Sequence, residues 1–145
     1  MVRRWFILAL TVVAATGCTS SPHPPVAGWP NDHSLTADRG NRTHAELAVL
    51  SGTTTITVRS TDLGDKLFRA WTPEDSRLVP HTHIDDDQVR LSFTDGNGQG
   101  PAEAIVELAS NVAWSVRLDG GSVEQDLDLR TTRVEAVDFG AGAQR

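Results

Sequence analysis

Two histidines and two carboxylates alternate within one short stretch of the chain. His81, His83, Asp85 and Asp87 are spaced two residues apart, so on an extended chain their four side chains would point the same way. Imidazole and carboxylate groups are ligands for zinc or manganese, which would suit a metal-binding protein or a metal-dependent hydrolase. Such an enzyme needs further ligands and a base, and no second cluster appears in the sequence. Because charged runs usually face water, we interpret 74–87 mainly as a solvated loop and keep the metal site as the alternative.

A glycine-rich segment, DGNGQG at 95–100, is a second candidate. It resembles the front of an EF-hand calcium loop, with oxygen-bearing side chains at alternate positions. The bidentate acid of such a loop would stand at Val106, whereas Glu107 comes one residue late. We therefore predict a glycine-rich hairpin loop. Glu103 and Glu107 alternate with apolar residues, which indicates the outward face of a strand.

Other catalytic patterns are missing from the sequence. It contains no Gly-x-Ser-x-Gly elbow and no phosphate-binding glycine loop, and tyrosine does not occur. We therefore predict that the protein is not an enzyme and that it needs no cofactor.

The single cysteine, Cys18, follows an apolar segment close to the N-terminus. Arg3 and Arg4 precede the apolar run 5–15, which is the layout of a secretory signal. This run is about half the ~20 residues that a membrane-spanning helix needs. Cys18 is the one position where the chain offers a thiol, the strongest ordinary nucleophile among the side chains.

The four residues ATGC at 15–18 resemble the lipobox of bacterial lipoprotein signal peptides, although that family usually has Leu at the position of Ala15. The resemblance implies a signal peptide over 1–17 and a diacylglyceryl thioether on Cys18, whose two acyl chains suffice for stable anchoring. It thus implies a lipid-anchored protein at the cell membrane, facing the extracytoplasmic side. Arg3 and Arg4 also fit a twin-arginine export motif, so the export route stays open.

Composition limits the domain count and the class of partner. The chain has 145 residues and a net charge of −6, and removal of the signal takes away two positive charges. An acidic chain of this kind is unsuited to nucleic acid. The length that remains after the signal is enough for one domain with a modest core.

Residues 18–44 form a separate compositional region. They are rich in Pro, Ser, Gly, Asn and Asp and have no apolar period, so they cannot bury enough apolar surface to offset the entropy of ordering. We predict a flexible tether. His23, His33 and His44 lie in it at irregular spacing, and we interpret them as solvated residues.

From residue 45 the pattern changes to short β-type runs. We predict strands at 46–50, 53–59, 66–71 and 88–94, followed at nearly regular spacing by 103–109, 113–118, 123–129 and 133–139. The fold class is therefore all-β, as a short-strand sandwich, barrel or β-solenoid-like domain over 45–145. Asp119-Gly120 favours an antiparallel hairpin, whereas the regular spacing favours a solenoid. Trp71 and Trp114 are expected in the core, and Trp29 outside it.

The segment WSVRLDGGSVEQDLDLRTTRVEAVDFGAGAQ, 114–144, resembles the adhesin-type β domains of bacterial envelope proteins. This resemblance implies an extracytoplasmic β scaffold and no catalytic residue. Such domains continue into further strands, so we expect 45–145 to be incomplete at its C-terminus, with an unpaired edge at 133–139.

The function expected from these features is that of a membrane-anchored lipoprotein with a non-catalytic binding or envelope scaffold domain and an envelope or extracellular partner. The alternative is a small extracytoplasmic metal-binding protein or hydrolase that uses the cluster from His81 to Asp87.

Overall fold

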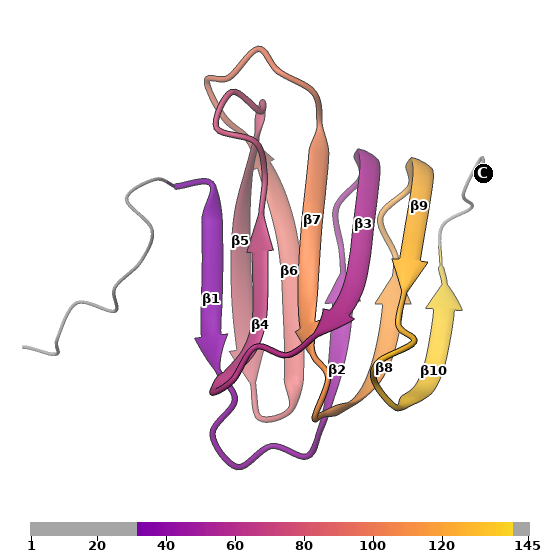
Figure 1. Cartoon of the computed structure of the whole chain (residues 1–145). Coiled ribbons are helices and arrows are strands. Elements are labelled where there is room, and N and C mark those ends of the chain that lie inside the picture. Colours follow the sequence, from indigo (N-terminus) through magenta and orange to yellow (C-terminus); the bar gives the residue numbers. More distant parts are fainter. Residues whose placement is uncertain (1–31, 141–145) are drawn as a thin grey trace, which may run out of the picture.

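The computed structural model describes residues 32–140, which contain ten β-strands and no helix (Figure 1). The strands are β1 (Ser34–Asp38), β2 (His44–Val49), β3 (Thr53–Thr61), β4 (Lys66–Trp71), β5 (Leu78–Asp85), β6 (Gln88–Asp95), β7 (Glu103–Ala109), β8 (Ala113–Leu118), β9 (Ser122–Asp128) and β10 (Val134–Phe139). The predicted all-β class is confirmed. The predicted signal peptide, Cys18 and Trp29 lie outside the described residues.

The strands form two five-stranded sheets that stack face to face. The front sheet has the order β1-β4-β7-β3-β9, and the back sheet has the order β10-β8-β2-β6-β5. Three front strands, β7, β3 and β9, are parallel, as are four back strands, β6, β2, β8 and β10. The chain passes from the back sheet to the front sheet at β2–β3, β6–β7 and β8–β9, so consecutive strands stack as rungs. The domain is thus a two-layer sandwich built from solenoid-like parallel ladders.

This topology corrects two turn predictions. Asp119-Gly120 does not close a hairpin, because β8 and β9 belong to different sheets. Its Gly120 N instead donates to Val49 O at 3.0 Å. The loop 95–100 likewise joins the back sheet to the front sheet, and Gly96 N and Gly100 N donate to Arg77 O and Asp75 O, each at 2.6 Å. At these crossings glycine does not form a reverse turn. Because it has no side chain, it allows two backbone segments to approach each other closely.

The core lies between the sheets. The alternation of Val89, Leu91 and Phe93 places all three in it, as the spacing predicts. Trp114 is completely buried, and its Nε1 donates to Ala109 O at 3.0 Å, which satisfies the indole N–H. Trp71, in contrast, is only half-buried, so the expectation that it is a core residue is wrong.

Strand β1 corrects the predicted tether. Ser34–Asp38 pairs with β4 in an antiparallel ladder, and Leu35 and Ala37 pack against the core. The flexible-tether prediction is therefore wrong for this part of 18–44. Its polar pattern hid a strand whose hydrogen-bonding partner, β4, and whose packing surface for Leu35 and Ala37 both come from distant parts of the chain.

Strand β5 corrects the loop predicted over 74–87. Leu78–Asp85 pairs along its whole length with β6, and the buried Pro80 lies opposite Phe93. Proline lacks the N–H of a ladder donor and is therefore confined to edge strands and bulges. Because β5 is the last strand of the back sheet, it can contain Pro80. In the sequence, that proline argued against a strand.

Among residues 32–140 we find no helix with the length and apolar character that crossing a membrane requires.

Candidate functional site

A row of alternating charges crosses the outward face of the front sheet. Arg69 on β4 lies opposite Glu107 on β7, Glu107 lies opposite Arg59 on β3, and Arg59 lies opposite Asp128 on β9. Opposed residues in paired strands project from the same face, so these four side chains form one row. Basic and acidic side chains alternate along it. We call these four residues the charged row.

Glu107 is the centre of the charged row. Its Oε1 accepts from Nη2 and Nε of Arg59 at 2.6 and 3.0 Å, and its Oε2 accepts from Nη1 of Arg69 at 3.4 Å. The Glu107 side chain is only 10% exposed, whereas the two arginine side chains are 49% and 41% exposed. The guanidinium groups therefore shield the carboxylate while remaining at the surface themselves. Glu103 and Glu107 share the outward face, as predicted, but only Glu107 is covered in this way.

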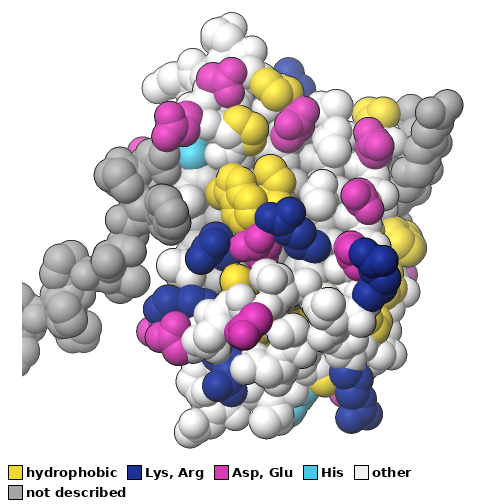
Figure 2. All heavy atoms as spheres, viewed as in Figure 1, with side chains coloured by type: hydrophobic (Ala, Val, Ile, Leu, Met, Phe, Trp, Pro, Cys, Tyr) yellow, Lys and Arg dark blue, Asp and Glu magenta, His cyan; other side chains and the backbone are white. Residues whose placement is uncertain are grey.

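An apolar patch borders the charged row. Trp71 lies opposite Ile105, and both are half-buried on the outward face. The Arg59 Cζ atom lies 5.8 Å from the centre of the Trp71 ring, within the range of a cation–π contact. Figure 2 shows apolar side chains in the middle of this face, with basic side chains beside them and an acidic one between. We call Trp71, Ile105, Arg59, Arg69 and Glu107 the Trp71 patch.

A cleft of about 390 Å³ adjoins this patch. Its wall includes the indole of Trp71 and residues that precede β1 or follow β4. His33 Nδ1 lies 2.8 Å from Thr72 Oγ1, and Thr72 N donates to His33 O at 2.9 Å, so the two segments are fastened together. The lining residues are His33, Ser34, Arg69, Trp71, Thr72, Pro73 and Glu74.

The predicted metal ligands do not meet at one point. His81, His83 and Asp85 all lie on the exposed side of β5, as an extended chain requires. Residues two apart on a strand are separated by about 6.5 Å, too far to share an ion without convergence. His81 Nε2 lies 2.8 Å from Thr94 Oγ1, on the neighbouring strand.

Asp87 lies beyond the end of β5 and faces a different element. Its Oδ2 is 2.9 Å from His44 Nε2, and its Oδ1 is 3.6 Å from Arg42 Nε. Within residues 32–140, no group of three or more His, Cys, Asp or Glu is placed to hold a metal ion.

The Trp71 patch was harder to recognise in the sequence than the histidine cluster. Its members are far apart in the chain, and only strand pairing brings them together.

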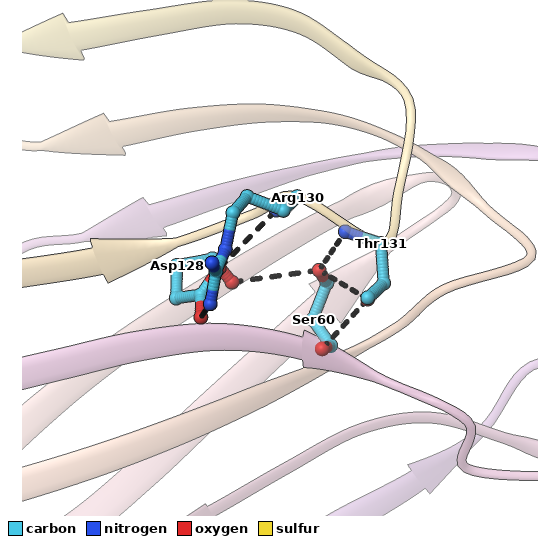
Figure 3. A network of polar contacts seen from close by, with 4 residues as sticks. All are labelled: Ser60, Asp128, Arg130 and Thr131. Atoms are coloured by element: carbon cyan, nitrogen blue, oxygen red, sulfur yellow. Dashed lines mark hydrogen bonds and ion pairs between the residues drawn. The ribbon is translucent and has the colours of Figure 1, made fainter.

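A polar network fixes the corner between β9 and β10 (Figure 3). The buried Ser60 Oγ lies 2.7 Å from Thr131 Oγ1 and accepts from Thr131 N at 3.3 Å, while Thr131 Oγ1 donates to Ser60 O at 2.8 Å. Arg130 pairs with Asp128 at 2.6 Å. The partners of the serine hydroxyl are another hydroxyl and backbone groups. The network therefore positions a turn and does not activate a nucleophile.

Two solved structures show a distant similarity to this chain. No family model matches the chain, and no curated protein matches its sequence. A structure described as a "putative cell adhesion protein" from Clostridium sporogenes is similar at a TM-score of 0.48 and 10% identity, over 73% of this chain and 54% of that one. A "putative adhesin" from Bacteroides fragilis is similar at a TM-score of 0.39 and 10% identity, over 76% of this chain and 59% of that one. The chain thus spans little more than half the length of either protein, and similarities of this size assign no ligand.

Proposed function

We propose that this protein is a membrane-anchored extracytoplasmic lipoprotein whose β domain binds a protein partner through the Trp71 patch, without catalysis. The observation that carries the proposal is the position of Trp71 on the outward face of the front sheet, where it lies opposite Ile105 and its ring centre is 5.8 Å from Arg59 Cζ. Burying a side chain of this size contributes about 2–3 kcal/mol. Because Trp71 is only half-buried in the free protein, a partner that covers the rest of its side chain would gain part of that free energy on binding.

The composition of the patch supports a protein ligand. Tryptophan and arginine are enriched among the residues that dominate protein–protein binding energy, usually in the centre of an interface. Arg59 is held both by Glu107 and by its contact with Trp71. Because these contacts already restrict its side chain, binding would cost less conformational entropy than it would for a free arginine.

The same contacts argue against acid–base chemistry at the patch. The carboxylate of Glu107 already accepts hydrogen bonds from two guanidinium groups. Guanidinium groups stay protonated and cannot exchange a proton near neutral pH. The charged groups here are therefore suited to holding one another and a partner in place.

The anchor is supported by the residue pattern from Arg3 to Cys18 and is tested by intact mass and membrane fractionation. We expect the exported protein to be in the membrane fraction with a lipid-sized gain in mass, and a Cys18→Ser variant to be released. Wild-type protein that is soluble and carries a free Cys18 thiol would refute the anchor.

The binding face is tested by site-specific photo-crosslinking in cells. A photoreactive residue at position 105 should give a discrete adduct, and Trp71→Ala should reduce its yield at least about tenfold, as expected for a central interface residue. The same group at position 92, on the outward side of β6 in the back sheet, is the control. Equal adducts from the two positions, or an adduct unaffected by Trp71→Ala, would contradict the proposal.

A further inference from the structure

The hydrogen bonds of Thr72 fix the tautomer of His33, a residue that lines the cleft beside Trp71. Thr72 Oγ1 donates its single hydrogen to Leu78 O at 2.8 Å. The contact of 2.8 Å between His33 Nδ1 and Thr72 Oγ1 therefore takes its hydrogen from the imidazole. A neutral imidazole that is protonated on Nδ1 carries a lone pair on Nε2. His33 Nε2 is thus a hydrogen-bond acceptor.

This acceptor is available to a ligand, and so is a donor beside it. Among the described residues, His33 Nε2 has no hydrogen-bond partner. Arg69 also lines the cleft, and within 32–140 its side chain bonds only to Glu107, from one nitrogen at 3.4 Å. Because a guanidinium group has five N–H donors, most of those of Arg69 remain available. The cleft therefore suits a polar group that both donates and accepts.

The rest of the cleft wall is mainly apolar. The indole of Trp71 and the ring of Pro73 belong to the lining. Arg69 and Glu74 contribute one positive and one negative charge, so the lining has no excess charge to attract an ion. The volume of about 390 Å³ is near the lower end of the range for ligand pockets, about 300–1,000 Å³. These features fit one neutral, mostly apolar side chain with a hydroxyl group at its end.

We propose that the cleft binds a tyrosine side chain of the protein partner. The phenol ring stacks on the indole of Trp71, its O–H donates to His33 Nε2, and its oxygen accepts from Arg69. Tyrosine is one of the residues that dominate protein–protein binding energy. That a protein supplies the phenol rests on the proposed function. The 145 residues of the chain include no tyrosine, so a second copy of them cannot fill the cleft in this way.

Other occupants match the cleft less well. Phenylalanine would leave the His33 acceptor without a partner. A saccharide carries several hydroxyl groups, and each one that loses water on binding needs a new partner. A mainly apolar wall would leave some of these hydroxyl groups unpaired. A phenol has a single hydroxyl group, which requires no more than the acceptor of His33 and the donors of Arg69.

The first test is an NMR titration of the whole exported chain in detergent, read at the indole N–H signal of Trp71. The probes are N-acetyltyrosinamide and N-acetylphenylalaninamide, which differ by one hydroxyl group. The titration is run at about pH 8, where a histidine side chain is ordinarily neutral. The tyrosine probe should bind about fivefold more tightly, because the other probe leaves the acceptor unpaired. Loss of the signal in Trp71→Phe verifies its assignment.

Two variants examine the acceptor itself. His33→Phe keeps a flat ring but has no Nε2, so the preference for the tyrosine probe should vanish. Thr72→Val removes the hydroxyl that fixes the tautomer, and the preference should fall at least about twofold. Thr82→Val is the matched control, because it also removes a hydroxyl that donates to a backbone carbonyl, but it does not line the cleft. Circular dichroism verifies the fold of each variant.

The second test uses the partner in cells, with the photoreactive residue at position 105. His33→Phe should lower the adduct yield about fivefold, whereas Thr82→Val should leave it unchanged. An adduct that falls with Trp71→Ala but not with His33→Phe would overturn the tyrosine site and leave the proposed function intact. The absence of any adduct, together with a retained preference for the tyrosine probe, would support the phenol site and contradict the proposed function.

Three results of the titration would also overturn the proposal. The first is equal binding of the two probes to the wild type. The second is a preference that persists in His33→Phe, because the hydroxyl would then bind elsewhere. The third is a shift of the Trp71 signal by methyl glucopyranoside at lower concentration than by the tyrosine probe, which would assign the cleft to a saccharide.

Discussion

Arg59 donates two hydrogen bonds to one oxygen of Glu107, from Nη2 at 2.6 Å and from Nε at 3.0 Å, across the parallel pair of β3 and β7. Arg69 approaches the other oxygen from β4 on the opposite side. One carboxylate thereby connects three adjacent strands of the front sheet, directly beside Trp71. This arrangement stabilises the sheet and positions the proposed binding surface.

Replacing Glu107 with alanine should lower the free energy of unfolding by about 2 kcal/mol, because the change removes three charge-assisted hydrogen bonds and leaves two arginines close together. Urea denaturation measures this loss. Glu103→Ala, on the same face of β7, is the control and should change the free energy by no more than about 0.5 kcal/mol. Equal losses for the two variants would show that the arginine contacts add nothing to stability.

Asp128 should make stability depend on pH in the acid range. The side chain and backbone N–H of Arg130 donate to its carboxylate and lower its pKa from 3.8 to about 2. A lowered pKa in the folded state stabilises the fold above the unfolded value. This contribution is fully present above pH 3.8 and is lost as the pH falls through about 2.

Carboxyl NMR titration checks this prediction directly. The Asp128 resonance should titrate near 2 in the wild type and close to 3.8 in Arg130→Ala. The Asp128→Asn variant should lose the corresponding part of the pH dependence of unfolding. An unchanged titration in Arg130→Ala would rule out this ion pair as the cause.

Gly120→Ala should destabilise the domain by about 1–3 kcal/mol, the usual range for forcing extra atoms into a packed site. A Cβ at position 120 would collide with the carbonyl oxygen of Ser51, where the loop after β8 crosses the loop after β2. Nothing lies within 4 Å of a Cβ placed on the neighbouring Gly121. Gly121→Ala should therefore be tolerated. Thermal unfolding compares the two variants, and equal losses of stability would contradict the close approach of the two loops at Gly120.

Removal of the Thr131 hydroxyl should loosen the corner between β9 and β10. Thr131→Val keeps the shape of the side chain but loses its hydrogen bonds to Ser60, at a cost of about 1 kcal/mol. Hydrogen exchange should accelerate over 128–133 while the rest of β3 stays protected. Thr57→Val, on the outward face of β3, is the comparison. Exchange that rises equally in both variants would mean that the corner is held by other contacts.

Alternation along a single strand was informative because it needs no knowledge of partners. Val89, Leu91 and Phe93 indicated a half-buried strand, and all three are buried in β6. Alternation did not reveal β1, which is held in place by its pairing with β4. It also did not reveal β5, where the proline at position 80 is acceptable only because the strand lies at the edge of the sheet. The two tryptophans could not be told apart by composition, since their exposure depends on which face of a sheet each one occupies.

The sequence by itself determined the all-β class, most of the strand positions and the pattern that predicts a lipid on Cys18, because each of these depends on residues that are close together in the chain. Only the tertiary structure decided which strands pair, that Glu107 lies between Arg59 and Arg69, and that Trp71 faces outward. The physical reason is that strand pairing brings together residues far apart in sequence. Local alternation limits which side chains can share a face, but only the packing of the two sheets selects their neighbours.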